Sequence, residues 1–380
     1  MKNFNLHSLL SAPFRPFFLG CSFICAIVPM IWILVFNGHI DFNSNYSSTL
    51  SWHIHEMFYG FGGGILFGFL LTASSNWTGK APVNGPSLLG LVSLWLMSRL
   101  LVFEQFPFML TAMLNIIFAF SANYLFYSMV RSNRNKYIIL PLTMIFSLSQ
   151  ALFIISDYIG SDFLYSWAIQ VSIASIFHIL LIMTGRLVPM FTRGMIGENI
   201  LSPSKVNSYL AIGPVLLLYL PQEYVNRYVA LVVYSVALMI HLQRCIQWKT
   251  IKTLKYPMVS ILHLGQLLSA LFFLSNILFH FGLIESSINI HFFTTGVFGV
   301  LAIAMLLRVS KGHTGRGFNV THLDKFCFLS IIGAFLLRSP LAALAQESTE
   351  YIFLLAAILW MSGFGIYFIT NLSALTRARH

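Results

Sequence analysis

The residues best suited to chemistry stand together in the segment WHIHEM, residues 52–57. Imidazole is the commonest metal ligand among side chains. Ionisable groups are costly in hydrocarbon, so a membrane helix usually keeps them only where they have a function. Because an apolar stretch runs on from this segment, His53, His55 and Glu56 are predicted to lie at the mouth of a membrane helix. Metal binding is the first hypothesis.

His53 and His55 are two residues apart, which is about 200° of rotation on an α-helix. Their imidazoles are therefore predicted to point to opposite sides and to serve two centres flanking the helix. In the alternative interpretation, Trp52 anchors an interfacial cluster and the histidines face lipid headgroups. Glu56 follows His53 by three residues, on nearly the same face. Its carboxylate could orient that imidazole, or could be an acid favoured by the dipole in a helix's first turn.

Three glycines, Gly60, Gly64 and Gly68, continue the face that carries His53. Small residues at a spacing of four usually let another helix approach closely. The same stripe would also let a flat macrocycle lie along the helix below an axial histidine. Close helix packing is the commoner cause of such a stripe.

Other histidines fall within or beside apolar stretches. His291 begins one stretch at a depth compatible with His53 and His55, and His263 lies inside another. Both are predicted as ligands. His178 and His280 are weaker candidates, because a lone membrane histidine is often only hydrogen-bonded to a neighbouring helix.

Two arginines, Arg99 and Arg338, lie near the predicted outer ends of their spans, where positive charge is otherwise scarce. Arginine pairs bidentately with carboxylates. Either residue could therefore hold a haem propionate, or could form a simple ion pair with Glu104 or Glu347.

The elements that must position these residues are membrane helices. The chain of 380 residues is 57% hydrophobic and only 9% charged, whereas soluble domains carry roughly 25% charged residues. A spanning helix needs about 20 mostly apolar residues, and lipid tolerates few other structures. We predict an all-α polytopic transmembrane helix bundle, as one integral membrane domain over 1–380 with possible halves 1–190 and 200–380. The sequence shows no clear internal repeat. The twelve predicted spans are 17–37, 52–73, 87–103, 107–130, 137–156, 163–183, 206–220, 224–243, 258–281, 288–307, 326–346 and 351–372.

The net charge of +11 does not indicate nucleic-acid binding, because nearly all Lys and Arg fall in alternate loops. By the positive-inside rule this pattern predicts that both termini are cytoplasmic, with some contact to anionic lipid. Three basic inner segments, 72–80, 185–194 and 308–317, could present N–H groups and arginine to an anion, or could be ordinary connections. No acidic residue lies in a predicted mid-membrane position, which argues against a proton pump.

The four cysteines form no CxxC pair. Cys21 and Cys25 lie on one face of the first span. They are interpreted as small apolar packing residues, with a soft copper site as the less favoured alternative.

An ordered set of motifs extends over essentially the whole chain. It comprises FRPFF at 14–18, WHIHEM at 52–57, GFLLTASSNWTG at 68–79, GRLVPMFTRG at 185–194, HLG at 263–265, and 291–317 with its RVSKGHTGR ending. In this combination the chain resembles the NnrS family. One departure is Ala73-Ser74-Ser75, where a more apolar stretch is expected.

The resemblance implies a multi-pass protein of the bacterial inner membrane that contains haem b and copper and takes part in nitric oxide metabolism and resistance. The histidines that correspond to the family's motifs are His53, His55, His263, His291 and His313. It does not imply which of them bind haem and which copper, nor the electron donor. Expected partners are nitric oxide and the lipid bilayer. The alternatives are a membrane carrier for metal, haem or a small solute, and a scaffold that helps to assemble another reductase.

Overall fold

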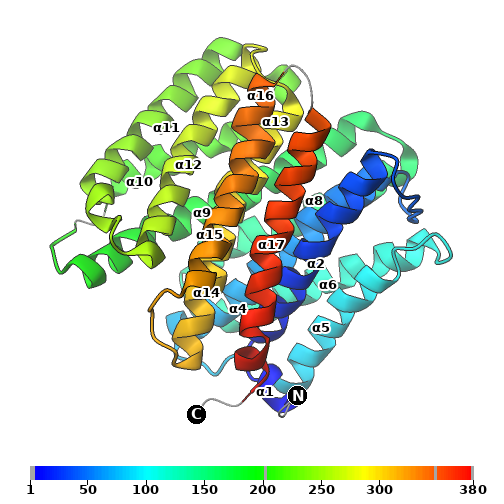
Figure 1. The fold of residues 1–380 in the computed structure, drawn as a ribbon, viewed down its shortest axis with the longest axis horizontal. Coiled ribbons are helices and arrows are strands. Elements are labelled where there is room, and N and C mark those ends of the chain that lie inside the picture. Colours follow the sequence, from blue (N-terminus) through cyan, green and yellow to red (C-terminus); the bar gives the residue numbers. More distant parts are fainter. Residues whose placement is uncertain (1–4, 201–202, 346–348, 378–380) are drawn as a thin grey trace. The chain divides into compact units, whose positions relative to one another are not determined.

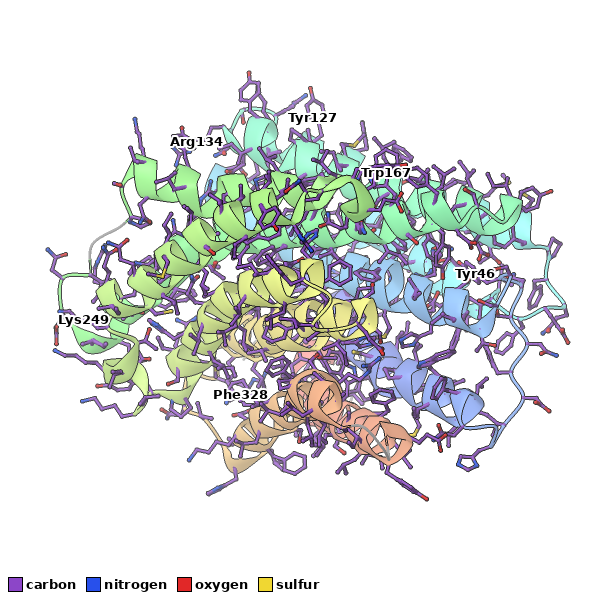
Figure 2. The ribbon with its side chains drawn as sticks, turned by 90° about the horizontal axis from the view of Figure 1, so that it is seen from above. Tyr46, Tyr127, Arg134, Trp167, Lys249 and Phe328 are labelled. Carbon is purple, nitrogen blue, oxygen red and sulfur yellow. The ribbon has the colours of Figure 1, made fainter. Side chains whose placement is uncertain are left out.

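The structure is a computed structural model that describes residues 5–200, 203–345 and 349–377. These residues form helices and connections without any β-strand, apart from one isolated bridge between Ser44 and Phe103 (Figure 1). Figure 2 shows the same helices with their side chains. The all-α prediction is confirmed.

Ten helices in the described part of the chain are long and apolar enough to cross a membrane. They are Phe14–Phe36 (α2), Thr49–Thr78 (α3, η1 and α4), Phe108–Val130 (α6), Asn135–Ile159 (α7 and α8), Asp162–Ile196 (α9), Arg227–Gln247 (α11), Pro257–His280 (α12), Ser286–Thr314 (α13, η5 and α14), His322–Leu344 (α15, η6 and α16) and Glu350–Thr376 (in α17, Thr349–Thr376). The chain is a multi-pass membrane protein.

Two of the twelve predicted spans are too short in the structure. Span 87–103 corresponds to α5, Gly85–Leu100, whose 16 residues reach about 24 Å against a hydrocarbon core of about 30 Å. Span 206–220 is an eight-residue helix, α10 (Lys205–Ile212), followed by a 3-10 helix, η2 (Gly213–Tyr219). Pro214 near the start of η2 has no N–H to donate and interrupts the α-helical pattern. The remaining short elements are α1 (Leu6–Leu9), η3 (Gln222–Tyr224) and η4 (Thr250–Thr253).

The chain forms two compact units that are discontinuous in sequence. Unit 1 comprises Met1–Ser175, Val309–Gly317 and Phe364–His380, and unit 2 comprises Ile176–Arg308 and Phe318–Gly363. Within unit 1, α2 packs on α4, α5 on α6, and α6 on both α4 and α8. Within unit 2, α11 packs along α12, and α12 and α15 both pack against η5.

Two hydrogen bonds of Arg15 join the two ends of unit 1. Its Nη1 atom donates to the carbonyls of Leu375 and Arg377, at 2.9 Å each. Carbonyls at the end of a helix have no partner within it, so the buried guanidinium of α2 caps the last turn of α17.

The glycine stripe of α4 is occupied by neighbouring helices. A Cβ atom on Gly68 would lie 2.7 Å from Cβ of Phe17, and one on Gly64 would lie 3.1 Å from Nε1 of Trp95 and also against Cys21. Close helix packing, the commoner of the two interpretations, is therefore confirmed at these positions. Cys21 is buried in this packing.

Two segments of the chain share one construction that the sequence did not reveal. In each, a short α-helix ends at a histidine and is followed by a seven-residue π-helix and a 16-residue α-helix. The first is α3 (Thr49–His55), η1 (Glu56–Gly62) and α4 (Gly63–Thr78); the second is α13 (Ser286–His291), η5 (Phe292–Phe298) and α14 (Gly299–Thr314). π-Helices are rare and are often found at functional sites.

The sequences of the two segments also align without a gap, and several residues at equivalent positions are the same or similar. The matched pairs are His55 and His291, Gly60 and Gly296, Gly63 and Gly299, Thr78 and Thr314, Gly79 and Gly315, and Lys80 and Arg316. Gly79 and Gly315 both have a positive φ, 71° and 76°, as is usual for the glycine that ends a helix. The structure thus corrects the view that the sequence holds no internal repeat.

The first prediction concerns the α2–α4 contact. Because the Gly68 position has no room for a side chain, Gly68→Val should lower the free energy of unfolding by about 1–3 kcal/mol through overpacking. Thermal unfolding of the detergent-purified protein measures this. Gly90→Val on α5 is the matched control, because no atom lies within 4 Å of its added Cβ. An equal loss of unfolding free energy in the two variants would contradict the close contact between α2 and α4 at Gly68.

Candidate functional site

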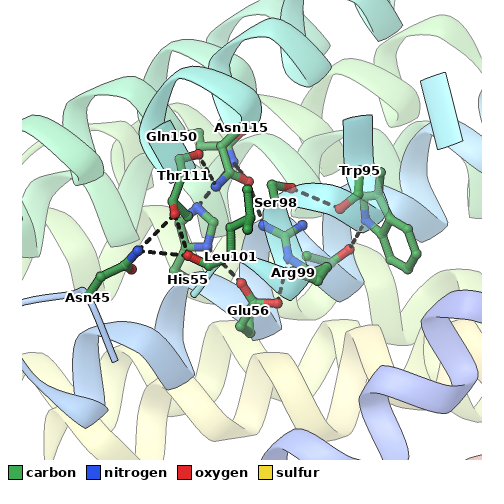
Figure 3. A network of polar contacts seen from close by, with 11 residues as sticks. Asn45, His55, Glu56, Trp95, Ser98, Arg99, Leu101, Thr111, Asn115 and Gln150 are labelled. Carbon is green, nitrogen blue, oxygen red and sulfur yellow. Dashed lines mark hydrogen bonds and ion pairs between the residues drawn. The ribbon is translucent and has the colours of Figure 1, made fainter. Parts of the chain in front are cut away.

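Five buried polar residues of unit 1 form a connected cluster, which we call the buried polar cluster (Figure 3). His55 and Glu56 come from the junction of α3 and η1, and α5, α6 and α8 each contribute one of the others. The members are His55, Glu56, Arg99, Asn115 and Gln150, and none is more than 8% exposed. Since buried charges are stable only when paired, their mutual contacts decide what the site can do.

Glu56 and Arg99 form the ion pair of the cluster. Nε of Arg99 lies 2.7 Å from Oε2 of Glu56, a contact that is ionic rather than a well-directed hydrogen bond. Nη2 of Arg99 donates to Oδ1 of Asn115 at 2.5 Å. A Cβ on Gly60, one turn further along η1, would come within 2.9 Å of Oε2. The glycine therefore leaves the room that the carboxylate occupies.

The carboxylate of Glu56 also fixes His55. Nδ1 of His55 lies 3.2 Å from Oε1 of Glu56, and Nε2 lies 3.2 Å from Nε2 of Gln150. The Gln150 amide also donates to Asn115, at 3.4 Å. A carboxylate accepts and an amide nitrogen donates, so this network assigns the proton to Nδ1 and the lone pair to Nε2. Metal-ligating histidines have the same arrangement, with one N–H held by a carboxylate, but here an amide occupies the lone pair.

Aromatic rings surround the imidazole of His55. The ring centroids of Tyr46, Tyr59 and Phe153 lie 5.0, 5.2 and 6.0 Å away. Burial and the nearby charge of Glu56 raise the pKa of Tyr46 well above its ordinary value, so its hydroxyl remains neutral. Trp95 donates from Nε1 to the carbonyl of Gly60 at 2.9 Å, which ties η1 to α5.

His53 lies against a different helix from His55. Its ring stacks on Trp32 of α2, with centroids 5.2 Å apart and planes 23° apart. The prediction that the two imidazoles point to opposite sides is confirmed. The imidazole that contacts Glu56 at 3.2 Å is that of His55, and the orientation of His53 by Glu56 stays a prediction. Both His55 and Glu56 are buried against α5, α6 and α8 at the start of the π-helical segment.

The two arginines have different partners from those predicted. Arg99 pairs with Glu56 rather than with Glu104. Arg338 in unit 2 donates from Nη2 to Oγ of Ser287 at 3.1 Å, and its guanidinium carbon lies 4.2 Å from the ring centroid of Phe353. Glu347, the predicted alternative partner, lies outside the described residues. The role of either arginine toward a propionate stays a prediction.

The other predicted ligands occupy dissimilar places. In unit 2, His263 is fully buried between the hydroxyls of Thr192 and Thr250, 2.7 Å from Nε2 and 2.8 Å from Nδ1, as a core histidine would be. His291 donates from Nδ1 to the carbonyl of Ser287 at 2.8 Å, which leaves the lone pair on Nε2.

His313 in unit 1 is exposed, with its ring 5.1 Å from that of Phe14. Among the residues that the structure describes, no three His, Cys, Asp or Glu side chains are placed to hold a metal ion together. Of the predicted site residues, the structure joins His55, Glu56 and Arg99.

Two members of the cluster, Asn115 and Gln150, were not predicted. Each is a carboxamide within a largely apolar span, and polar groups inside a membrane are usually functional or paired. That signal could have marked them as candidates, although it could not have shown that they meet His55 and Arg99.

A family model described as NnrS protein matches residues 8–379. No curated protein matches the chain. Two of the motifs that carry the resemblance meet in unit 1, where the N–H of Phe14 in FRPFF donates to Oγ1 of Thr72 in GFLLTASSNWTG at 3.0 Å.

The second prediction concerns the ion pair. Glu56→Gln leaves the buried Arg99 charge without its counter-ion and should lower the free energy of unfolding by about 3–5 kcal/mol. The double variant Glu56→Gln, Arg99→Met should recover part of this loss. Chemical unfolding of the four members of this mutant cycle in detergent measures the coupling.

The control for this cycle is Glu198→Gln in unit 2. Glu198 is partly exposed to solvent and pairs with Lys249 and Lys252, which lower its pKa to about 2. Solvent screens such pairs, so its loss at pH 7 should change stability little. A cost of Glu56→Gln no greater than that of the control would contradict a buried, mutually dependent pair.

Proposed function

Because the chain belongs to the NnrS family, we propose that it is a haem- and copper-binding protein of the bacterial inner membrane that acts in nitric oxide response or resistance. In this proposal nitric oxide binds at a histidine-ligated metal centre. The observation that carries the proposal is the orientation of His55 by the Glu56–Arg99 pair within a multi-pass helical protein.

The histidines suit haem better than a metal ion that is held by three or more converging side chains. Haem iron takes one or two axial protein ligands, so it does not require three side chains to converge. His55 has its Nδ1 proton held by Glu56, and His291 has its own held by a backbone carbonyl. Both histidines stand immediately before a π-helix. Imidazole also suits copper, but the copper part of the proposal rests on family membership alone.

The residues of the cluster have separable roles in this proposal. Bound haem iron would supply the atom to which nitric oxide binds. Arg99 pairs with Glu56, and Glu56 keeps the proton of His55 on Nδ1. The Gln150 amide occupies the Nε2 lone pair, so it must turn away before that nitrogen can bind a metal. Tyr46, Tyr59 and Phe153 exclude water. Nitric oxide is small and apolar and can enter from lipid.

The third prediction tests the proposal directly. Protein purified from cells supplied with haem precursor and copper should show a Soret band that shifts on addition of nitric oxide. The band should weaken in His53→Ala, His55→Ala or His291→Ala, each of which would remove a proposed metal ligand, and persist in His39→Ala, whose residue is exposed in a loop. Visible spectra and metal analysis measure this. Full Soret intensity in all three ligand variants would refute the assignment of these histidines.

The fourth prediction concerns Gln150. If the amide competes with a metal for Nε2 of His55, Gln150→Leu should raise the haem-to-protein ratio, because leucine cannot donate to that lone pair. The effect should vanish in a His55→Ala background. Haem extraction and quantification measure it. An unchanged or lower ratio in the single variant would show that Gln150 does not compete at this nitrogen.

A second candidate is a membrane carrier for metal, haem or a small solute. Two arginines of unit 2, Arg244 and Arg308, favour it, since both are buried without an ion pair to any described carboxylate. Folded but colourless protein from the purification above would support the carrier and refute the haem proposal.

A further inference from the structure

We propose that unit 2 contains a binding site for a small monovalent inorganic anion between Arg244 and Trp248, at the C-terminal end of α11. Nothing in the proposed haem chemistry requires this site, and its test is independent of haem. Four observations carry it: an unpaired buried charge, a second unsatisfied donor beside it, the neutrality of the acceptors that Arg244 contacts, and a glycine that faces the free nitrogen.

The charge of Arg244 has no counter-ion in the described part of the chain. The residue is 1% exposed. Its Nε donates to Oδ1 of Asn207 at 2.9 Å and its Nη2 to the carbonyl of Asn207 at 3.2 Å, and both acceptors are neutral. Nη1 is buried and has no acceptor among the residues that the structure describes. An uncompensated buried charge is costly, so a missing partner is expected here.

Trp248 supplies the second donor. It is fully buried, and its Nε1 likewise finds no acceptor within the described ranges. The guanidinium carbon of Arg244 lies 5.6 Å from the centroid of the indole ring. Guanidinium and indole N–H groups can only donate. A ligand that satisfies both must therefore be an acceptor, and one negative charge would balance the single positive charge.

The groups around Arg244 stabilise its positive charge in part. They do not supply hydrogen-bond acceptors for its Nη1 or for Nε1 of Trp248. The ring of Trp248 gives a cation–π contact, and the carbonyls at the end of α11 favour a positive charge. His241, one turn earlier, accepts from Gln266 at 2.6 Å and donates to the carbonyl of Ala211 at 3.1 Å, so it is neutral. None of these contacts provides an acceptor to Nη1 or to the indole N–H.

Gly185 of α9 leaves space in front of Nη1. A Cβ added to Gly185 would lie 3.7 Å from that nitrogen, which is the one non-local atom within 4 Å. Nitrate, nitrite and chloride each carry one negative charge and accept hydrogen bonds, as the two donors require. A lipid phosphodiester also carries one negative charge, but the burial of both donor side chains favours the small ion.

Nitrate titration of the purified protein tests the site. In gluconate buffer at constant ionic strength, wild-type protein should bind nitrate saturably by calorimetry and melt at a higher temperature in nitrate or chloride than in gluconate. Trp248→Phe removes one hydrogen bond to a charged group and keeps the ring, so it should weaken binding about tenfold. Gly185→Ala should weaken binding by filling the space, and Arg244→Gln should abolish it.

Arg227→Gln is the matched control, because Arg227 is exposed at the other end of α11. This variant should bind nitrate with unchanged affinity. Equal melting of the wild type in all three anions would overturn the proposal. If Arg244→Gln does not fold, wild-type affinity in both Trp248→Phe and Gly185→Ala would overturn it. Nitrate affinity should also be the same in nanodiscs of phosphatidylcholine alone and in nanodiscs that include an anionic phospholipid, and loss of nitrate binding only in the latter would assign the site to anionic lipid instead.

Discussion

The ion pair between Glu56 and Arg99 is the interaction on which the rest of unit 1 depends. A charge buried in a membrane protein must be neutralised locally, and this pair does so with 2.7 Å between Nε and Oε2. The remaining acceptors and donors then assign the tautomer of His55 and the orientation of Gln150. The packing around it follows the same need, because Gly60 leaves room for the carboxylate and Trp95 ties the π-helix to α5.

In unit 2 the buried polar side chains have neutral partners instead of an ion pair. Some of their hydrogen-bond donors find no acceptor among the described residues. His263 is satisfied by two threonine hydroxyls. Arg338 donates to a serine hydroxyl and contacts an aromatic ring, but its Nη1 has no acceptor among the described residues. Arg244 is satisfied only in part. The repeated α–π–α construction therefore carries a charged cluster after His55 but apolar residues and threonines after His291. Similar backbones in the two segments support different chemistry.

Much of this could be predicted from the sequence, and the limits have physical reasons. Apolar length identified the membrane class and most of the spans, because lipid demands long apolar helices. The spacing of His53 and His55 predicted their opposite directions, because helical rotation is fixed. The partners of Glu56 and Arg99 could not be predicted, since they depend on which helices pack together. The repeat is difficult to predict from the sequence because the two segments share only a few glycines and a Thr-Gly pair. The π-helices could not be predicted, since they have no clear sequence signal.

The bonds of Arg15 to the end of α17 have a consequence for biosynthesis. A chain emerges from the ribosome from its N-terminus, and parts generally fold as they become available. Arg15 is buried in unit 1 and cannot form its two hydrogen bonds until the carbonyls of Leu375 and Arg377 have been synthesised. These two residues are among the last of the described residues to be made. The unit that holds the buried polar cluster therefore completes its folding only after the last turn of α17 has been translated, and a product terminated before that turn would leave the guanidinium without these two acceptors.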